Sequence, residues 1–443
     1  MTKQAQLLID FLAAHGMATS LAIQNALRVS QPTVSRLLAG VADDVVVCGK
    51  GKASRYALAQ PIGKFGAQQP VWRIADDGLP TRLGTLSFLA KSQMHIEAEG
   101  VSELFEPTLE APLPWYLSPL RAQGFLGRVL ARHLATLGLN ANPDRWDPEA
   151  VLLAALHTHD APGALLLGEA VVPPGVQPIT LAMENPLAAL DALAFDVAQT
   201  LPVGSSAAGE QAKFLVTSET GEAFVVKFSP PRDTPFGARW SDLLCAEALC
   251  NEVLARHGSN TAQTHIVQTA SRTYLLSKRF DRVGRHGRRH VVSVGAAHVG
   301  FVKGRYTHWA ATAEALARQG RLQPDEARQL STQLQFGHLI GNTDMHSGNA
   351  SLFVQGSSLA DIVQGKFRLA PVYDMLPMRY KPDPMLGSVD YAPFEVDFSL
   401  AEQSSRCAAR DFWQSLASHA LVSPALQTVA AIMATRMGCN QPL

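Results

Sequence analysis

The most informative segment of the chain reads Ile340-Gly341-Asn342-Thr343-Asp344-Met345-His346-Ser347-Gly348-Asn349. It places Asp344 five residues before Asn349, after a run with helical spacing over residues 324–340. This is the spacing of a phosphoryl-transfer catalytic loop, in which the aspartate orients a substrate hydroxyl or accepts its proton and the asparagine holds a metal ion. One such pair arises by chance in a chain of 443 residues. Its meaning therefore depends on what lies upstream and downstream.

A loop of small residues lies upstream, with the sequence Gly204-Ser205-Ser206-Ala207-Ala208-Gly209-Glu210-Gln211-Ala212-Lys213. Small side chains let backbone N–H groups approach a polyphosphate closely, so the segment is a candidate phosphate loop. Glu210 stands where a Walker A motif needs lysine, which excludes that motif. The alternative is an ordinary turn before the strand-like residues 214–216.

The next candidate is Lys227, which lies in the apolar β-run Ala223-Phe224-Val225-Val226-Lys227-Phe228. Protein kinases carry a lysine on such a strand, where it neutralises nucleotide phosphates and pairs with a glutamate on a nearby helix. The helical pattern over residues 241–256 supplies Glu247 and Glu252 as candidates, and we predict Glu247 as the partner. The alternative is an edge-strand lysine beside a surface helix.

Two further segments complete the order expected of a kinase. The strand-like residues 273–277 lead into Lys278-Arg279-Phe280-Asp281-Arg282, at the position of the hinge between two lobes. Asp374 ends the apolar run Leu369-Ala370-Pro371-Val372-Tyr373, where a second metal-binding carboxylate is expected. Between them, the arginine-rich residues 282–290 predict a solvated loop.

Two other kinds of enzyme are disfavoured. His338 and His346 lie close to Asp344 in sequence, but the chain has no HExxH or comparable second set of metal ligands. A Ser-His-Asp hydrolase is disfavoured because the Gly-x-Ser-x-Gly motif is absent.

Residues 1–60 have the pattern of a separate module. Apolar residues at helical spacing occupy three segments up to Gly40, and two β-runs then flank a basic Gly-Lys-Gly-Lys turn. Three helices and a hairpin in this order resemble a winged helix-turn-helix, with base-reaching side chains on the third helix and cations on the wing. The predicted DNA contacts are Gln31, Thr33, Ser35, Arg36, Lys50, Lys52 and Arg55. The alternative is a module used for protein contacts or dimerisation.

The region after this module is less informative. Residues 60–70 have the Pro/Gly content of a linker, and residues 72–74 and 81–86 have the pattern of strands in a small sheet. The proline-rich residues 172–178 follow, and no segment of residues 70–200 carries recognisable chemistry.

Composition limits the partners and the location. Lys+Arg and Asp+Glu both number 38, so no global field favours nucleic acid or an anionic membrane, and any such affinity must be local. No apolar run reaches the length of a membrane span, and the first residues lack a signal-peptide core. We therefore expect a cytoplasmic protein with no membrane partner.

Several blocks together resemble the HipA family of toxin Ser/Thr kinases. Residues 206–213 match its Ser-x-Ala-Gly-x-Gln-x-Lys loop. Later matches are Val226-Lys227, Arg279-Phe280-Asp281-Arg282, Gly341-x-Thr343-Asp344-x-His346-x-x-Asn349 and Pro371-x-Tyr373-Asp374. The resemblance covers residues 70–440, strongly at 204–228 and 273–376. The fused N-terminal module is similar to the longer, YjjJ-like branch of this family.

The resemblance implies ATP and Mg²⁺ as cofactors, with Asp344 as the catalytic residue and Asn349 and Asp374 as metal ligands. It implies ATP contacts at Lys227, Arg279, Phe280, Asp281, His346 and Tyr373, and a phosphate loop of Ser206, Ala207, Ala208, Gly209 and Lys213. Ser206 would be the autophosphorylation site that shuts the kinase off. The implied partners are a protein substrate, such as an aminoacyl-tRNA synthetase or another translation component, and an antitoxin.

The resulting prediction is an α+β chain with a two-lobed, protein-kinase-like (HipA-like) fold. Its expected parts are a winged helix-turn-helix (1–60), a HipA-like N-terminal subdomain (61–200), a kinase N-lobe (201–282) and a mainly helical C-lobe (283–443). Two functions compete. One is a toxin kinase that phosphorylates a protein Ser or Thr, and the other is a DNA-binding regulator whose kinase-like part only binds nucleotide.

Overall fold

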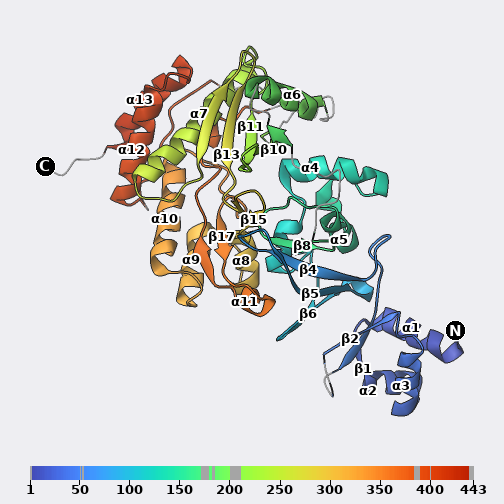
Figure 1. Cartoon of the computed structure of the whole chain (residues 1–443). Helices are drawn as coiled ribbons and strands as arrows, with labels where there is room; N and C mark the ends of the chain where they lie inside the picture. Colours follow the sequence, from blue (N-terminus) through green and yellow to red (C-terminus); the bar gives the residue numbers. More distant parts are fainter. Residues whose placement is uncertain are drawn as a thin grey trace.

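A computed structural model describes residues 2–49, 51, 54–170, 179–181, 185–199, 211–383, 390–399 and 401–438. The chain is α+β, with a small N-terminal group of helices, a middle sheet and two lobes (Figure 1). The N-terminal helices lie at one end of the molecule and the C-terminal helices α12 and α13 at the other.

The N-terminal part has the elements that the sequence pattern predicts. They are the helices α1 (Lys3–His15), α2 (Ser20–Leu27) and α3 (Gln31–Ala39), and the strands β1 (Ala18–Thr19), β2 (Val45–Cys48) and β3 (Arg55–Leu58), in the sheet order β1-β3-β2. Leu8, Leu12, Ile23 and Val34 form its fully buried core. This amphipathic spacing explains why the three helices pack together.

The middle sheet is antiparallel, with the order β7-β6-β5-β4-β8. Its strands are β4 (Gln68–Ile74), β5 (Pro80–Phe88), β6 (Met94–Ala98), β7 (Val101–Phe105) and β8 (Leu165–Leu167), and the elements between β7 and β8 include η3 (Trp115–Leu120), α4 (Gly124–His133) and α5 (Pro148–Leu156). The strands predicted at residues 72–74 and 81–86 are confirmed in β4 and β5. The predicted linker is wrong in part, because Ile62 is fully buried and the Gln60 N–H donates to Phe88 O at 2.9 Å.

The first lobe is a five-stranded sheet with one long helix packed on it. The strand order is β12-β13-β11-β10-β9, and the strands are β9 (Thr180–Leu181), β10 (Lys213–Ser218), β11 (Ala223–Phe228), β12 (Thr264–Gln268) and β13 (Thr273–Lys278). Helix α7 (Pro235–Arg256) packs on this sheet through Leu244 and Ala248 against Leu275. Helices α4 and α6 (Pro186–Gln199) contribute to the core around β10 and β11. The hairpin predicted around residues 219–222 is confirmed, with Lys213 opposite Lys227.

The second lobe is mainly helical. It contains α8 (Val294–Phe301), α9 (Trp309–Arg318), α10 (Pro324–Leu339), α11 (Leu359–Val363), α12 (Gln403–Ala417) and α13 (Pro424–Met437), with a sheet of β16 (Val291–Ser293), β17 (Ser351–Val354) and β18 (Phe367–Leu369). The residues that connect α10 to β17 are the predicted catalytic loop.

The middle part and the second lobe share one hydrophobic core. Trp115 of η3 packs edge-on against Phe301 of α8 and Phe367 of β18, with ring centroids 5.0 and 5.6 Å apart. Such aromatic contacts bury large areas and fix the packing angle of their elements. The two parts are therefore held together by hydrophobic packing.

The arginine-rich hairpin of β14 (Arg282–Val283) and β15 (Gly287–Arg288) also docks on other elements. The Arg288 N–H donates to Ala75 O at 3.0 Å, and Arg285 Nη2 donates to Glu219 O at 2.7 Å. The side chain of Arg282 is only 10% exposed. The prediction of a solvated loop is wrong here, because the sequence does not show that the turn after β4, the loop at residues 159–163 and the 219–222 turn contact this hairpin.

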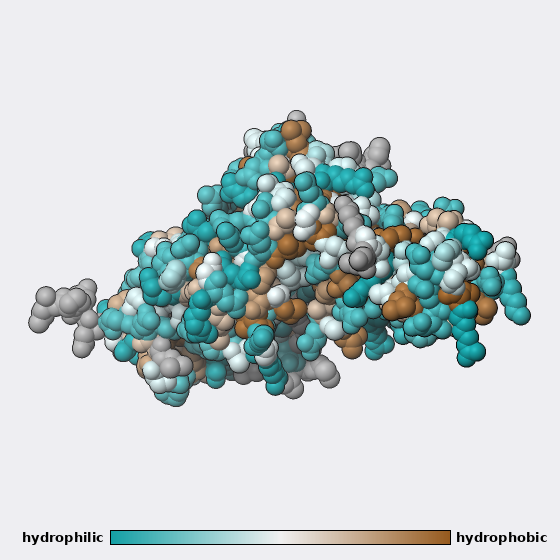
Figure 2. Space-filling view, turned by 90° about the horizontal axis from the view of Figure 1, so that it is seen from below, coloured by the Kyte–Doolittle hydropathy of each residue, from teal (hydrophilic) through white to brown (hydrophobic). Residues whose placement is uncertain are grey.

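The face seen from below is mostly hydrophilic, and its hydrophobic residues lie in separate groups (Figure 2). Among the residues that the structure describes, no helix is both long and apolar enough to cross a membrane.

The close approach at Gly287 gives a test of this docking. A Cβ atom there would lie 2.0 Å from Asp76 O and 2.6 Å from Val283 O. Both oxygens belong to the backbone, so no side-chain rotation can relieve the clash. We expect Gly287→Ala to lower the free energy of unfolding by about 1–3 kcal/mol, as overpacking does. Urea unfolding followed by tryptophan fluorescence measures the change.

Gly66→Ala is the matched control, because a Cβ at Gly66 meets nothing within 4 Å and its φ is not in the left-handed region. Equal unfolding midpoints for the two variants would show that the hairpin does not dock as described.

Candidate phosphoryl-transfer site

Lys227 lies between two carboxylates in the interior of the first lobe. Its Nζ atom donates to both oxygens of Glu247, at 2.6 and 2.7 Å, and to Asp374 Oδ1. Lys227 is 5% and Glu247 2% exposed. Strand β11, helix α7 and the segment after β18 each supply one of these residues, so the ion cluster joins the two lobes.

Burial and charge pairing act in opposite directions on these pKa values. Burial disfavours the charged form of Lys227, but the carboxylates of Asp374 and Glu247 raise its pKa above the usual value. Burial also opposes the charge on Asp374, yet Lys227 and Lys213 hold the pKa of Asp374 low. The pKa of Glu247 is raised by burial, against the effect of Lys227. Lys227 and Asp374 are therefore a charged pair.

The backbone at Asp374 is unusual. Its φ is +57°, in the left-handed region that costs most non-glycine residues about 1–2 kcal/mol. Aspartate is one of the few residues that adopt this conformation readily. Buried Met375 and Leu376 anchor the chain directly after it. This conformation directs the carboxylate to Lys227.

The predicted catalytic loop is organised by its own hydrogen bonds. Helix α10 ends at Leu339, and Gly341 with φ +75° turns the chain out of the helix. The Asp344 N–H donates to Asn342 Oδ1 at 3.0 Å, and Asn349 Nδ2 donates to Asp344 O at 2.8 Å. The side chain of Asp344 is 51% exposed. The loop is thus closed on itself while the Asp344 carboxylate stays open to a reactant.

Tyr373 links this loop to Asp374. Its hydroxyl donates to Gly348 O at 2.6 Å and lies 2.7 Å from Ser351 Oγ. Burial raises the pKa of Asp374, and His346 adds to the lowering effect of Lys227 and Lys213. The structure therefore brings together the segments that carry Asp344, Asn349 and Asp374.

His346 has a second set of contacts within the loop. Its Nδ1 atom accepts from the Gly348 N–H at 3.0 Å, its carbonyl accepts from Trp309 Nε1 at 2.9 Å, and its Nε2 atom lies 4.0 Å from Asp344 Oδ1. These contacts fix the residue beside Asp344.

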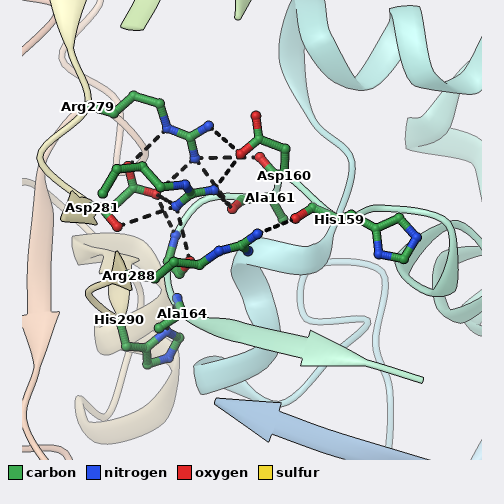
Figure 3. A network of polar contacts seen from close by, with 10 residues as sticks. His159, Asp160, Ala161, Ala164, Arg279, Asp281, Arg288 and His290 are labelled. Carbon is green, nitrogen blue, oxygen red and sulfur yellow. Dashed lines mark hydrogen bonds and ion pairs between the residues drawn. The ribbon is translucent and has the colours of Figure 1, made fainter. Parts of the chain in front are cut away.

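The predicted hinge residues do not all lie together. The ring of Phe280 packs against Tyr373 and Phe353, with centroids 5.6 and 5.8 Å away. The side chains of Arg279 and Asp281 instead enter a buried ion network (Figure 3). The structure thus brings Phe280 to the Asp374 segment and directs Arg279 and Asp281 away from Lys227, and the ATP contact predicted for these two stays a prediction.

Sequence reasoning missed Asp160, the carboxylate from the middle part that completes this network. Its Oδ1 atom lies 2.7 Å from Arg279 Nη1 and 2.6 Å from Arg282 Nη2. The sequence around it, His159-Asp160-Ala161-Pro162-Gly163, reads as an ordinary turn. The sequence offered one signal for such a residue: the several arginines of residues 279–289 need carboxylate partners.

Two of the described residues have side-chain oxygens that could bind Mg²⁺. Carboxylate and amide oxygens of Asp374 and Asn349 suit a hard divalent cation. Within the described ranges, no three His, Cys, Asp or Glu residues gather as a metal-binding group. The predicted residues Ser206, Ala207, Ala208 and Gly209 of the phosphate loop lie outside the described residues, as do Lys50 and Lys52.

A cavity of about 310 Å³ lies beside the catalytic loop. It is lined by the last turns of α10, by residues 341–343, by Arg379 and by residues 394–397. Thr343, which precedes Asp344, forms part of its wall.

Comparison with known proteins agrees with the order of these blocks. The family described as HipA-like C-terminal domain matches residues 205–437, and the family described as YjjJ-like toxin, middle domain, matches residues 65–173. Toxin YjjJ of Escherichia coli (strain K12) is 33% identical over 438 residues, which cover 95% of each chain. The chain belongs to the HipA family. Within it, the chain is a YjjJ-like toxin.

Solved structures support the fold of this HipA-family chain. The toxin–antitoxin system HipA, HipB and operator DNA complex of Shewanella oneidensis MR-1 contains a chain that matches with a TM-score of 0.53 and 16% identity, over 83% of this chain and 95% of that one. The Helicobacter pylori proinflammatory kinase CtkA matches with a TM-score of 0.34 and 13% identity, over 52% of this chain and 91% of that one, which is too low to support an argument. The match to the chain of the HipA complex confirms the predicted HipA-like α+β fold.

The pairing of Lys227 with Glu247 gives a test of the ion cluster. Glu247→Gln leaves Lys227 with Asp374 as its one carboxylate partner. We expect a loss of about 1.5–3 kcal/mol in the free energy of unfolding, the range for a hydrogen bond to a charged group. Urea unfolding of the full chain measures it.

Glu222→Gln is the matched control, since it breaks the Lys278–Glu222 pair of the same sheet, whose side chains are 39% and 47% exposed. Exposed pairs contribute about 0–1 kcal/mol. If Glu247→Gln were no more destabilising than Glu222→Gln, the buried cluster would not have the described geometry.

Proposed function

We propose that this HipA-family protein is a protein Ser/Thr kinase that transfers the γ-phosphate of ATP to a protein hydroxyl. The observation that carries this proposal is the buried Lys227 held between Glu247 and Asp374. A lysine anchored by a helix glutamate, next to an aspartate that can bind Mg²⁺, is the arrangement that phosphoryl transfer uses.

Each residue then has a defined task. Lys227 offsets the negative charge of the nucleotide phosphates, while Glu247 keeps the ammonium group in place. Asp344, with its open carboxylate, orients the acceptor hydroxyl and accepts its proton. Asn349 and Asp374 would hold Mg²⁺, which supplies charge neutralisation on the phosphates.

The proposal includes a site of autophosphorylation and a protein substrate. Ser206, in the predicted phosphate loop, is the proposed autophosphorylation site, and Lys213 at the start of β10 lies opposite Lys227 in the sheet. The cavity beside Thr343 offers room for a side chain of the substrate next to the acceptor. A translation component such as an aminoacyl-tRNA synthetase is the proposed class of substrate in the cytoplasm.

The N-terminal part supports a second proposed activity, DNA binding through a winged helix-turn-helix. Gln31, Ser35 and Arg36 on α3 are exposed, and so is Arg55 on β3 of the same module. Arg36 Nη2 donates to Thr33 Oγ1 at 3.4 Å. Exposed amide, hydroxyl and guanidinium groups on one helix are suited to base edges. The solved HipA relative forms a complex with HipB and operator DNA, which supports DNA and an antitoxin as proposed partners.

Replacement of the catalytic residue tests the kinase proposal. We expect Asp344→Asn to lower phosphate transfer by about 10²–10⁴-fold, because the acceptor proton loses its base. Incubation with radiolabelled Mg²⁺-ATP, followed by phosphopeptide mapping for Ser206 and by transfer to a cell lysate, measures the activity. Asp325→Asn, at an exposed position of α10, is the control. Absence of any phosphoprotein with the wild-type chain would refute the kinase proposal.

Replacement of Arg36 tests the DNA-binding proposal. Loss of a base contact costs about 1–3 kcal/mol, so Arg36→Ala should weaken retention of enriched genomic fragments by about tenfold or more. Lys3→Ala removes an exposed cation from α1 and should have little effect. Asp344→Asn should bind DNA as the wild type does. The proposal fails if the wild type enriches no fragment above a random pool.

A further inference from the structure

The ion network next to the hinge is made of side chains from two distant parts of the chain (Figure 3). Asp160 Oδ1 lies 2.7 Å from Arg279 Nη1 and 2.6 Å from Arg282 Nη2. Asp281 Oδ2 lies 3.0 Å from Arg279 Nη2 and 2.6 Å from Arg282 Nη1. Each arginine therefore bridges the same two carboxylates. Asp281 belongs to the hinge segment itself, whereas Asp160 comes from the loop between α5 and β8.

This network depends on Asp160 for its charge balance. Arg288 lies against the same carboxylates and donates to His159 O at 2.6 Å, so three guanidinium groups face two carboxylates. Burial and the charge of Arg282 lower the pKa of Arg288 to about 10. The side chain of Asp160 is 46% exposed, but those of Arg279 and Arg282 are only 6% and 10% exposed. Removal of the Asp160 charge would leave these buried cations with less negative charge beside them, and an unbalanced buried charge is costly.

The network also fixes the backbone on both sides of Phe280. The Arg279 N–H donates to Ala223 O of β11 at 2.8 Å, and Gly163 N–H donates to Asp281 Oδ2 at 2.8 Å. Arg282 Nη2 donates to Ala161 O at 2.8 Å. Phe280 is therefore flanked by two residues whose side chains contact residues 160–163.

A chain of contacts continues from Phe280 to the proposed metal ligands. The Phe280 ring packs on Tyr373, which directly precedes Asp374. The Tyr373 hydroxyl donates to Gly348 O, next to Asn349. Phe280 thus contacts the Asp374 segment directly and the Asn349 segment through Tyr373, and these are the two segments that we propose to bind Mg²⁺.

We infer that Asp160 is a positioning residue for the nucleotide site: through Arg279 and Arg282, the middle part of the chain holds Phe280 against Tyr373. This inference rests on the proposed function, since it concerns the same nucleotide site. It gives the middle part an indirect role in nucleotide binding, because none of its residues lies in the Lys227 cluster.

The test compares Asp160→Asn with Asp76→Asn in the full chain. Asparagine keeps the shape of the side chain and removes its charge. The Asp76–Arg289 pair joins the same two parts of the chain at 3.1 Å, and its carboxylate is about as exposed as that of Asp160. The pairs differ in the arginine, because Arg289 is 53% exposed whereas Arg279 and Arg282 are 6% and 10% exposed, so Asp76→Asn is the matched control. Calorimetric titration with Mg²⁺-ATP, well below the unfolding temperature of each variant, measures the dissociation constant of folded protein. A residue that only stabilises the fold would change the unfolding temperature and leave this constant unchanged.

We expect the dissociation constant for Mg²⁺-ATP to rise by about fivefold or more in Asp160→Asn, within the usual range of coupling between sites, and by less than about twofold in Asp76→Asn. Arg282→Gln removes the Arg282 guanidinium group from the network, while Asp160 keeps its bond to Arg279. This variant should show the same rise in the dissociation constant. It replaces Asp160→Asn as the decisive variant if that protein does not fold.

Wild-type affinity in folded Asp160→Asn or in folded Arg282→Gln would overturn the inference and leave the kinase proposal intact. If the wild-type chain binds Mg²⁺-ATP but transfers no phosphate, the kinase proposal is refuted. The affinity comparison would still decide the role of Asp160 in that case. A wild-type chain that binds no Mg²⁺-ATP would overturn both.

Discussion

The buried cluster of Lys227, Glu247 and Asp374 is the interaction on which the rest of the structure depends. A lysine that is 5% exposed is stable only beside carboxylates, and the two that it contacts come from α7 and from the segment after β18. The cluster therefore requires the sheet of the first lobe, its long helix and the second lobe to meet at one point. The catalytic loop is linked to the same point through Tyr373 and Gly348.

The middle part of the chain closes this arrangement from the opposite side. It shares a hydrophobic core with the second lobe through Trp115, and its loop at residues 160–163 holds the hinge segment that leaves β13. Both contacts are buried, so the relation of the two lobes is fixed by packing and by charge together. In this chain a third structural part thus contacts both the second lobe and the hinge segment.

Local sequence patterns predicted the helices and strands well, but they predicted the contacts of side chains in only some segments. Apolar runs identified β10 and β11, and helical spacing identified α10, because these elements bury part of their surface. Helix α7 was also predicted, although it is buried on nearly all sides. The same reasoning failed for the arginine-rich hairpin and for residues 60–70. Charged or Pro/Gly-rich segments look solvated in isolation, whereas here Arg282 and Ile62 are covered by elements distant in sequence.

The sequence alone determined the family, the order of the kinase-like blocks and the identity of Lys227, Asp344, Asn349 and Asp374 as candidate site residues, since motif spacing is a property of the linear chain. The sequence offered Glu247 and Glu252 and predicted Glu247 as the partner of Lys227, and the tertiary structure shows this pairing and its physical reason. These residues are separated by about 140° around the axis of α7, and packing on the sheet buries Glu247 beside Lys227 and leaves Glu252 exposed. Only the fold revealed Asp160, because a partner 119 residues from Arg279 is brought close by packing, which no local period encodes.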